Sequence, residues 1–349
     1  MAHRITGKEL KELGYEQGKI LGIARDLSET ALQKMTKNEV LALLKKAKSY
    51  PELFLSDELL KPLAEAMVQE AAIPPDATIA LNETSGRYAT YGSDNIEAGA
   101  RTQMDIAMRL PITAGGALMP DAHQGYGLPI GGVLATRNAI IPYGVGVDIG
   151  CRMALTIFDI PAEHLQTHQA TYKRELIAQT KFGAGAGFKG RERADHEVLQ
   201  SDVFSMNPFI NNLRDKAYTQ LGTSGGGNHF VEWGVIEFEQ RDETLNIDKG
   251  NYVAVLSHSG SRGLGATIAG YYTKLAKEIC KLPKEAANLA WLGLDSEEGN
   301  EYWLAMNLAG DYASACHEII HKKIADAIGG QVLAKVENHH NFAWKEKWN

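Results

Sequence analysis

The sequence of 349 residues is poor in cysteine and holds no long apolar run. Its three cysteines, Cys151, Cys280 and Cys316, are an odd number in a long chain, so they predict no disulfide framework and favour a reducing compartment. No stretch approaches the ~20 apolar residues that a membrane-spanning helix needs, and the N-terminus has no apolar signal core. We therefore expect a cytoplasmic protein without a membrane segment.

The sequence also lacks a strong excess of charge of either sign. The 36 lysines and arginines stand against 43 aspartates and glutamates, which gives a formal net charge of −7. This balance argues against an indiscriminate nucleic-acid binder, although a local basic groove is compatible with it. Because 44% of the residues are hydrophobic, the chain can bury a sizeable core, and we expect a globular protein of one large or two ordinary domains.

Two sequence textures divide the chain. Residues 5–72 carry apolar residues at helical spacing, as in EVLALLKKAKSY, and predict an N-terminal helical module over residues 1–72. From about residue 95, short apolar runs broken by glycine predict strands, and helical patterns at 263–279 and 301–330 lie between them. The mixture predicts an α+β fold. The predicted strands lie at 131–142, 151–160, 251–260 and 331–340.

The segment PYGVGVDIGC places Asp148 three positions before Cys151, after a glycine-rich approach. Glycines have no Cβ and allow tight backbone turns close to a ligand. A carboxylate oxygen beside a thiolate suits a divalent transition metal, whereas a lone cysteine is more commonly just buried. The spacing alone leaves both interpretations open.

Several histidines stand where an apolar run gives way to polar or glycine-rich sequence. A single histidine of this kind is usually a hydrogen-bonded structural residue, but loops at strand ends can converge in space. Imidazole, thiolate and carboxylate together make a ligand set for Zn, Mn, Fe or Co. The set therefore predicts a metal site, although no single member does. The histidines are His229, His258, His339 and His340, and a further loop, bounded by proline and glycine, holds Asp121 and His123.

The segment CHEIIH offers a rival metal site. His317 and His321, with Glu318 between them, have the HExxH spacing that presents two imidazoles and a general base on one helix face in zinc peptidases. No third ligand is obvious, although Glu337 is conceivable. A ridge of isoleucines runs beside the histidines, so an amphipathic helix with two histidines at its border also explains the motif. We favour the helix.

The patch KFGAGAGFKGRER, residues 181–193, combines cations with aromatic residues. It lacks the spacing of a P-loop or a Rossmann fingerprint. Cations between Phe182 and Phe188 could hold backbone phosphates while the rings stack on bases, and a solvated basic loop is an equally good interpretation. The cations are Lys181, Lys189, Arg191 and Arg193.

In this order, the segments MPDAHQGYGLPIGGV, GVGVDIGC, GGGNHFVE, SHSGSRGLG and HHN resemble the RtcB family of GTP-dependent RNA ligases. Each piece alone is a weak signal, whereas the ordered set is specific. The resemblance covers roughly residues 95–345 and implies a catalytic domain over residues 95–349. It implies an RtcB-like α+β fold, in which central sheets are flanked by helices and the metal site lies at converging strand-end loops.

The resemblance also implies a pair of Mn²⁺ ions bridged by the cysteine. His340 is preferred to His339 because the family's ligand stands directly before an asparagine, here Asn341. The implied metal ligands are Asp148, Cys151, His229, His258 and His340.

Further residues match the family's contacts to nucleotide and RNA. Asn228 is implied to face the phosphate of GTP and Glu232 its guanine. Arg262 matches an arginine that holds RNA phosphate. We add Lys189 and Arg191 of the basic patch as expected RNA contacts.

The implied reaction joins an RNA 3′-phosphate or 2′,3′-cyclic phosphate end to a 5′-hydroxyl end, in RNA repair or tRNA splicing. A family histidine takes GMP from GTP, passes it to the RNA 3′-phosphate, and the 5′-hydroxyl displaces it. An archease-type accessory protein is a further implied partner.

The nucleophilic histidine of the family lies in an HGAGR-type motif that this sequence does not contain. We therefore expect it beyond residue 349, with the catalytic domain incomplete at its C-terminus. The alternative is a metal- and RNA-end-binding protein without ligase activity, and a zinc peptidase using HEIIH is a more remote one.

Overall fold

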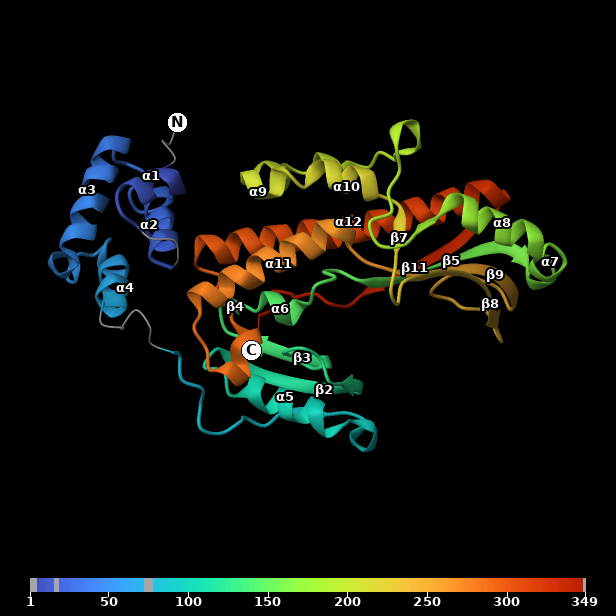
Figure 1. Cartoon of the computed structure of the whole chain (residues 1–349), viewed down its shortest axis with the longest axis horizontal. Coiled ribbons are helices and arrows are strands. Elements are labelled where there is room, and N and C mark those ends of the chain that lie inside the picture. Colours follow the sequence, from blue (N-terminus) through green and yellow to red (C-terminus); the bar gives the residue numbers. More distant parts are fainter. Residues whose placement is uncertain (1–4, 16–18, 72–77, 348–349) are drawn as a thin grey trace. The chain divides into compact units, whose positions relative to one another are not determined.

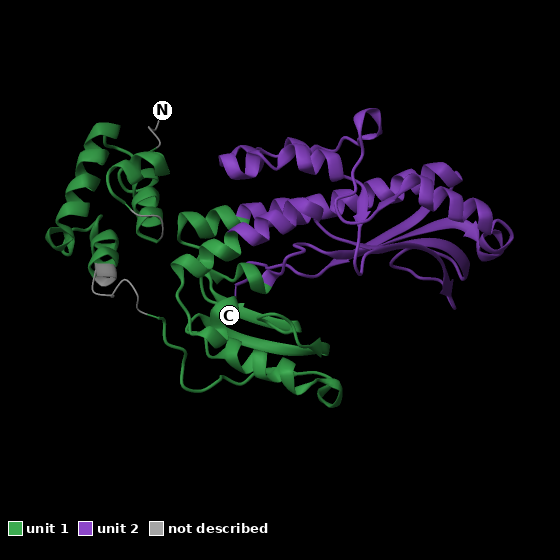
Figure 2. Cartoon of the chain, in the orientation of Figure 1, with its two compact units in different colours: residues 1–144, 272–303 green, residues 145–271, 304–349 purple. Residues whose placement is uncertain are grey.

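The computed structural model describes residues 5–15, 19–71 and 78–347. Parts of the two predicted domains, residues 1–4, 16–18, 72 and 348–349, lie outside the described residues. Helices and strands alternate along the chain, which confirms the predicted α+β fold. The chain divides into two compact units, residues 1–144 with 272–303 and residues 145–271 with 304–349 (Figure 2). In the described part of the chain, no helix combines the length and the apolar character needed to cross a bilayer.

The first unit begins with a group of helices. Thr6 and Thr36 each accept a hydrogen bond from the backbone of a glutamate three residues later, and each glutamate side chain bonds back. These capping boxes fix where two of the helices begin. The apolar faces form one core that includes Leu10, Leu21 and Leu44, all fully buried. The helices are α1 (Gly7–Glu12), α2 (Lys19–Glu29), α3 (Lys37–Ser49) and α4 (Lys61–Ala71).

The remainder of the first unit is a small sheet covered by one helix. The strand order is β1-β2-β3, and Met104 of the helix packs against Leu118 of the central strand. A second, two-stranded sheet pairs β4 with β10. The elements are β1 (Ala89–Thr90), α5 (Ala98–Met108), β2 (Thr113–His123), β3 (Ile130–Thr136), β4 (Ala139–Ile140) and β10 (Leu292–Gly293), with the short helix α6 (Pro142–Val145) at the border with the second unit.

The second unit is built on a four-stranded antiparallel sheet in the order β11-β5-β9-β8. A short parallel pair, β6 with β7, forms a separate two-stranded sheet. The strands are β5 (Arg152–Pro161), β6 (Lys181–Phe182), β7 (Thr223–Gly225), β8 (Phe230–Phe238), β9 (Gly250–Ser259) and β11 (Val332–His339). The helices are α7 (Ala162–Thr167), α8 (Gln169–Gln179), α9 (Pro208–Asn211), α10 (Arg214–Gln220), α11 (Arg262–Ile279) and α12 (Glu297–Ile328), and the last two also extend into the first unit.

Helix α12 lies along one face of this sheet (Figure 1). Its Ile320 and Ile324 share a buried core with Val253 and Val255 of β9, because alternate strand residues point to the same face. The helix begins four residues before the predicted pattern. There the Ser296 hydroxyl accepts a hydrogen bond from the backbone of the first turn, which the apolar periodicity did not reveal. It ends before the left-handed glycine Gly329, as predicted.

Candidate metal centre

Four candidate ligands lie at the same end of the four-stranded sheet, where its strands begin or finish. Cys151 directly precedes β5, His229 directly precedes β8, His258 is the penultimate residue of β9, and His340 directly follows β11. The strands are antiparallel neighbours, so the start of one lies beside the end of the next. The register makes this explicit, since Phe230 and Met153 both pair with His258. The strand order thus brings together residues that are up to 189 positions apart in the sequence (151 to 340).

The side chains at this end are in direct contact. The Cys151 sulfur lies 3.2 Å from Nε2 of His258 and 3.4 Å from Nε2 of His229. Nε2 of His258 is 3.3 Å from Nε2 of His340. Nε2 of His229 is 2.8 Å from Oδ2 of Asp148. Five donor atoms therefore face one small volume, as ligands of a metal centre do.

The donors fall into two groups that share one atom. Cys151, His258 and His340 form one group and Asp148, Cys151 and His229 the other, and within each group the donor atoms lie within 4.8 Å of one another. Thiolate, imidazole and carboxylate are all ligands of divalent transition metals. The geometry therefore fits two cations that share the Cys151 sulfur.

The Asp148 carboxylate supports the same fit. Its Oδ2 atom is buried and receives no hydrogen bond of acceptable geometry, although His229 approaches it to 2.8 Å. Burial opposes its ionisation, but the neighbouring His229 and Cys151 and the charge of Arg262 outweigh burial and hold the pKa of Asp148 below its usual value. A buried, ionised oxygen whose neighbouring imidazole is poorly aligned for a hydrogen bond is costly unless a cation also satisfies it.

The thiol and two of the imidazoles are kept uncharged when no metal is bound. Burial and the nearby Asp148 carboxylate raise the pKa of Cys151 well above its usual range, so without metal the group is a thiol. Burial lowers the pKa of His258 and of His340, which keeps both rings neutral and able to donate a lone pair. A bound cation deprotonates a coordinating thiol.

Two glycines make room for this arrangement. A Cβ on Gly260 would lie 2.2 Å from Oδ2 of Asp148, and one on Gly225 would lie 1.3 Å from a guanidinium nitrogen of Arg262. A side chain at either glycine would therefore displace the functional side chain that it meets. The glycine-rich texture around the motifs is therefore explained by the close approach of backbone and functional side chains.

Arg262 is also part of the centre. Its guanidinium donates to Nδ1 of His229 at 2.8 Å and to the carbonyl of Gly260 at 3.1 Å. Its own backbone is left-handed, with φ of 51°, where α11 begins. The structure thus places the predicted phosphate-binding arginine against a candidate metal ligand.

The predicted nucleotide contacts lie beside the centre. The Asn228 carbonyl is 3.2 Å from Nδ1 of His258, and its side chain is exposed. Glu232 is exposed on β8, on the face of the sheet that carries His258, because Phe230 pairs with His258 and alternate residues share a face. The second C-terminal histidine, His339, packs instead against Phe342 and Trp344.

The basic patch is mostly used within the fold. Lys181 pairs with Glu192 at 2.9 Å, and Arg193 pairs with Asp215 at 3.1 Å. Phe188 is buried with two lysine amino groups over its ring, so this ring is not exposed for stacking on a base.

Two cations of the patch stay free of these pairs. Lys189 and Arg191 are exposed in the turn that follows Phe188. The loop before them lies next to the centre, since Gly183 donates to the carbonyl of Gly225 at 2.7 Å.

The CHEIIH segment has no peptidase geometry. His317 and His321 are 1% and 3% exposed, and both bond to the Ser257 hydroxyl. Glu318 faces away from them and contacts His196. Within the described residues, neither potential metal group includes these histidines. The amphipathic helix is confirmed, but the histidines lie on its buried face and not at its border.

Sequence reasoning missed Arg152, which is 6% exposed behind the centre. Its guanidinium donates to the carbonyl of Gly310 on α12 at 2.8 Å and to Glu337 on β11 at 2.9 Å. It thereby ties the strand that follows Cys151 to two neighbouring elements. An arginine directly after a candidate ligand was the available signal. Asp121 and His123 end β2 in the first unit, outside both donor groups of the described residues.

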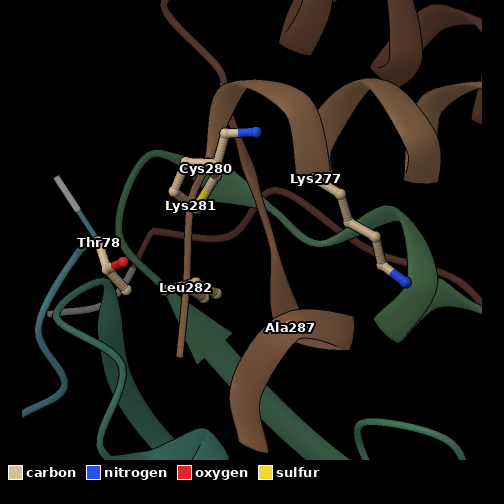
Figure 3. A pocket seen from close by; sticks show the side chains of 6 residues that line it. All are labelled: Thr78, Lys277, Cys280, Lys281, Leu282 and Ala287. Atoms are coloured by element: carbon tan, nitrogen blue, oxygen red, sulfur yellow. The ribbon is translucent and has the colours of Figure 1, made fainter. Parts of the chain in front are cut away.

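A cavity of about 220 Å³ lies in the first unit (Figure 3). Lys277, one of its lining residues, donates to Asn288 and lies over the ring of Tyr143. The lining has no carboxylate and no imidazole and offers no site for a hard or borderline cation. The lining residues are Thr78, Lys277, Cys280, Lys281, Leu282 and Ala287.

Comparison with known proteins agrees with the motifs. The family model described as tRNA-splicing ligase RtcB matches residues 103–206 and 201–349. The RNA-splicing ligase RtcB of Escherichia coli K12 is 29% identical over 279 residues, which cover 72% of this chain and 65% of the relative. RNA-splicing ligase RtcB homolog 1 of Entamoeba dispar is 29% identical, with 72% and 54% covered.

An archaeal relative, the tRNA-splicing ligase RtcB of Nanoarchaeum equitans, is 28% identical, with 62% of this chain and 52% of the relative covered. The chain thus spans between about half and two thirds of the length of these relatives. The family model covers most of the chain, including every candidate ligand. We conclude that the chain belongs to the RtcB family.

Proposed function

We propose that this chain acts in the ligation of RNA, joining a 3′-phosphate or 2′,3′-cyclic phosphate end to a 5′-hydroxyl end with GTP and two Mn²⁺ ions. The observation that carries the proposal is the pair of donor groups that share the Cys151 sulfur. Relatives that match the chain are named RNA-splicing or tRNA-splicing ligases, which supports RNA as the substrate.

One ion would be held by Cys151, His258 and His340 and the other by Asp148, Cys151 and His229. When bound, such a pair neutralises phosphate charge and aligns the attacking and leaving oxygens of a phosphoryl transfer.

Arg262 links this centre to an anionic ligand. It donates to Nδ1 of His229, so that nitrogen bears a lone pair and the ring proton stands on Nε2, towards Asp148. For Nε2 to offer a lone pair to a cation, the proton has to move to Nδ1. The guanidinium then loses its acceptor, and we propose that it turns to an RNA phosphate. Asn228 and Glu232, both exposed beside His258, are the proposed contacts to GTP phosphate and guanine.

The test begins with the chelator-treated chain. Titration with Mn²⁺ should give two ions per chain, and incubation with labelled GTP, followed by a denaturing gel, reports covalent GMP. Ligation of RNA with 3′-phosphate and 5′-hydroxyl ends should exceed that of matched RNA with 3′-hydroxyl and 5′-phosphate ends. Because the nucleophilic histidine is expected beyond residue 349, the GTP and ligation assays are also run on a chain extended past that residue. Two bound ions and selective 3′-phosphate binding, with GMP attached to neither chain, would favour the binding protein without ligase activity. A chain that binds no Mn²⁺ would refute both.

The RNA contacts have a separate test. Lys189→Ala with Arg191→Ala should weaken RNA binding and reduce its salt dependence by about one to two ion equivalents, because each phosphate contact releases counterions. The matched control is Lys322→Ala, which removes an exposed lysine from α12 in the same unit. An equal loss of RNA affinity in the double variant and in the control would show that Lys189 and Arg191 are not specific RNA contacts. An archease-type accessory protein also stays a prediction.

A further inference from the structure

The buried pair His317 and His321 on α12 lies directly behind the candidate ligand His258. Strand β9 alternates, so the side chain of Ser257 points to α12 while that of His258 points to the other face. The Ser257 hydroxyl is 2.6 Å from Nδ1 of His317 and 2.7 Å from Nε2 of His321. Neither donor group of the proposed metal centre includes these two histidines.

Their hydrogen bonds have only one consistent direction. The carbonyl of Ser259, 3.2 Å from Nε2 of His317, can only accept, so Nε2 carries the proton of a neutral ring. Nδ1 of His317 then accepts from the Ser257 hydroxyl. That hydroxyl has spent its proton and accepts from Nε2 of His321.

The same logic completes the chain. Nδ1 of His321 is left to accept from the Thr156 hydroxyl at 2.7 Å. Burial favours the neutral rings that this order requires, and it lowers the pKa of His317 to about 4 and that of His321 to about 3. The chain therefore runs from Thr156 through both rings to Ser259 without a reversal.

The contacts of His317 are placed symmetrically about His258. One ring nitrogen meets the side chain of the preceding residue, Ser257, and the other meets the carbonyl of the following residue, Ser259. The Ser259 hydroxyl is held in turn by the carbonyl of Ser224 on β7. The backbone on both sides of His258 is thus fixed to one rigid ring.

We propose that His317 is a positioning residue of the metal centre: by holding Ser257 and Ser259, it directs the His258 imidazole at Cys151 and His340. The inference rests on the proposed metal function, which does not itself give His317 any role. A buried network that served stability alone would matter equally along its length. Positioning instead predicts that the effect on the metal is largest at His317 and absent at Thr156, the far end.

The experiment is a titration of the chelator-treated full chain with Co²⁺, followed by the visible and thiolate charge-transfer bands of the bound ion. His317→Leu should weaken binding of the ion that His258 ligates roughly tenfold and change its visible bands, because orienting partners behind a ligand contribute about 10–100-fold. Thr156→Val, of nearly equal size, should lower stability and leave the affinity and spectrum unchanged. His317→Gln keeps a donor for Ser259 and should restore most of the affinity.

The outcomes separate this inference from the proposed function. Wild-type chain that binds no Co²⁺ overturns the metal centre and the positioning role with it. Wild-type chain that binds Co²⁺, with His317→Leu unchanged or with Thr156→Val equally affected, overturns the positioning role alone.

A measurement on the unmodified chain decides the matter should His317→Leu not fold. Nitrogen-15 NMR of the metal-free protein should show His317 and His321 with the proton on Nε2. A proton on Nδ1 of His317 would break its bond to Ser259 and overturn the inference.

Discussion

The two faces of strand β9 carry two histidine clusters of opposite character. On one face, His258 meets His340 and the Cys151 sulfur through atoms that can all donate lone pairs to a cation. On the other face, His317 and His321 meet hydroxyl and carbonyl groups, with one proton for every contact. The difference teaches that residue type alone does not define a metal site. The partner of each ring nitrogen decides it.

The clusters also differ in what shapes them. The ligand side depends on backbone form, with Gly260 giving space to Asp148 and the left-handed Asn341 following His340. The buried side depends on matched protons between side chains. Substitutions that change backbone form or space should therefore disturb the ligand side, whereas substitutions that remove a hydrogen-bonding group should disturb the buried side.

The largest effect is expected from Cys151→Ala, because this substitution removes the one donor that both groups share. Affinity for both ions should fall by more than the roughly 100-fold that loss of an outer partner costs at most. Metal content after equilibrium dialysis against Mn²⁺ measures it. Cys280→Ala, which removes a buried cysteine outside both donor groups of the described residues, is the control. Retention of one ion at wild-type affinity would show that the sulfur is not shared.

The next effect is expected from Gly260→Ala, which places a Cβ on the Asp148 carboxylate. Moving Asp148 should weaken binding of the ion it shares with His229, and overpacking should cost about 1–3 kcal/mol of stability. Gly270→Ala is the matched control, since a Cβ there meets nothing within 4 Å. In the middle of α11, it should stabilise the fold by up to about 1 kcal/mol and leave metal binding alone. The same metal affinity in both variants would contradict the close approach.

The buried side should respond to pH. The folded pKa values of His317 and His321, about 4 and about 3, lie below the ordinary value of 6.5, so the unfolded chain binds more protons between these limits. The stability that these two neutral rings contribute is therefore fully present above pH 6.5, and it is lost as the pH falls towards their folded pKa values of about 4 and about 3. When the pH falls from 7 to 5, the free energy of unfolding should decrease by up to about 2 kcal/mol for each histidine.

Urea unfolding with chelator at the two pH values measures this loss. The free energy of unfolding of His321→Leu should depend less on pH than that of the wild type, and the difference should equal the contribution of one histidine. Equal pH dependence in the two proteins would show that His321 is not buried as a neutral ring.

The sequence predicted three of the four strands that carry the site, β5, β9 and β11, because short apolar runs that give way to polar or glycine-rich sequence are local signals. It did not predict β8, which positions His229. Through the family resemblance that the ordered motifs carry, it also implied that Cys151, His229 and His258 lie together, and the structure brings them into contact. It did not predict that Phe188 is buried, because that ring packs against Lys323, which is far along the chain. Nor did it reveal the chain of hydrogen bonds between β9 and α12. The partners of those hydroxyl and imidazole groups depend on how the helix packs on the strand, and no local sequence pattern records that packing.

The smallest effect is expected at Asn341, whose backbone shapes the turn after His340 and whose side chain donates to the carbonyl of Asp148 at 3.4 Å, a contact that both variants below lose. Its φ of 55° is left-handed, and its carbonyl accepts from the backbone of Gly150 at 3.0 Å. Glycine adopts this form freely, whereas alanine is strained, so Asn341→Gly should be more stable than Asn341→Ala by about 1 kcal/mol. This reverses the order that the two residues show in helices, and chemical unfolding of both variants measures it. If alanine proved the more stable, the turn after His340 would not need its left-handed form, and the distinction between a backbone-shaped and a proton-matched face would weaken.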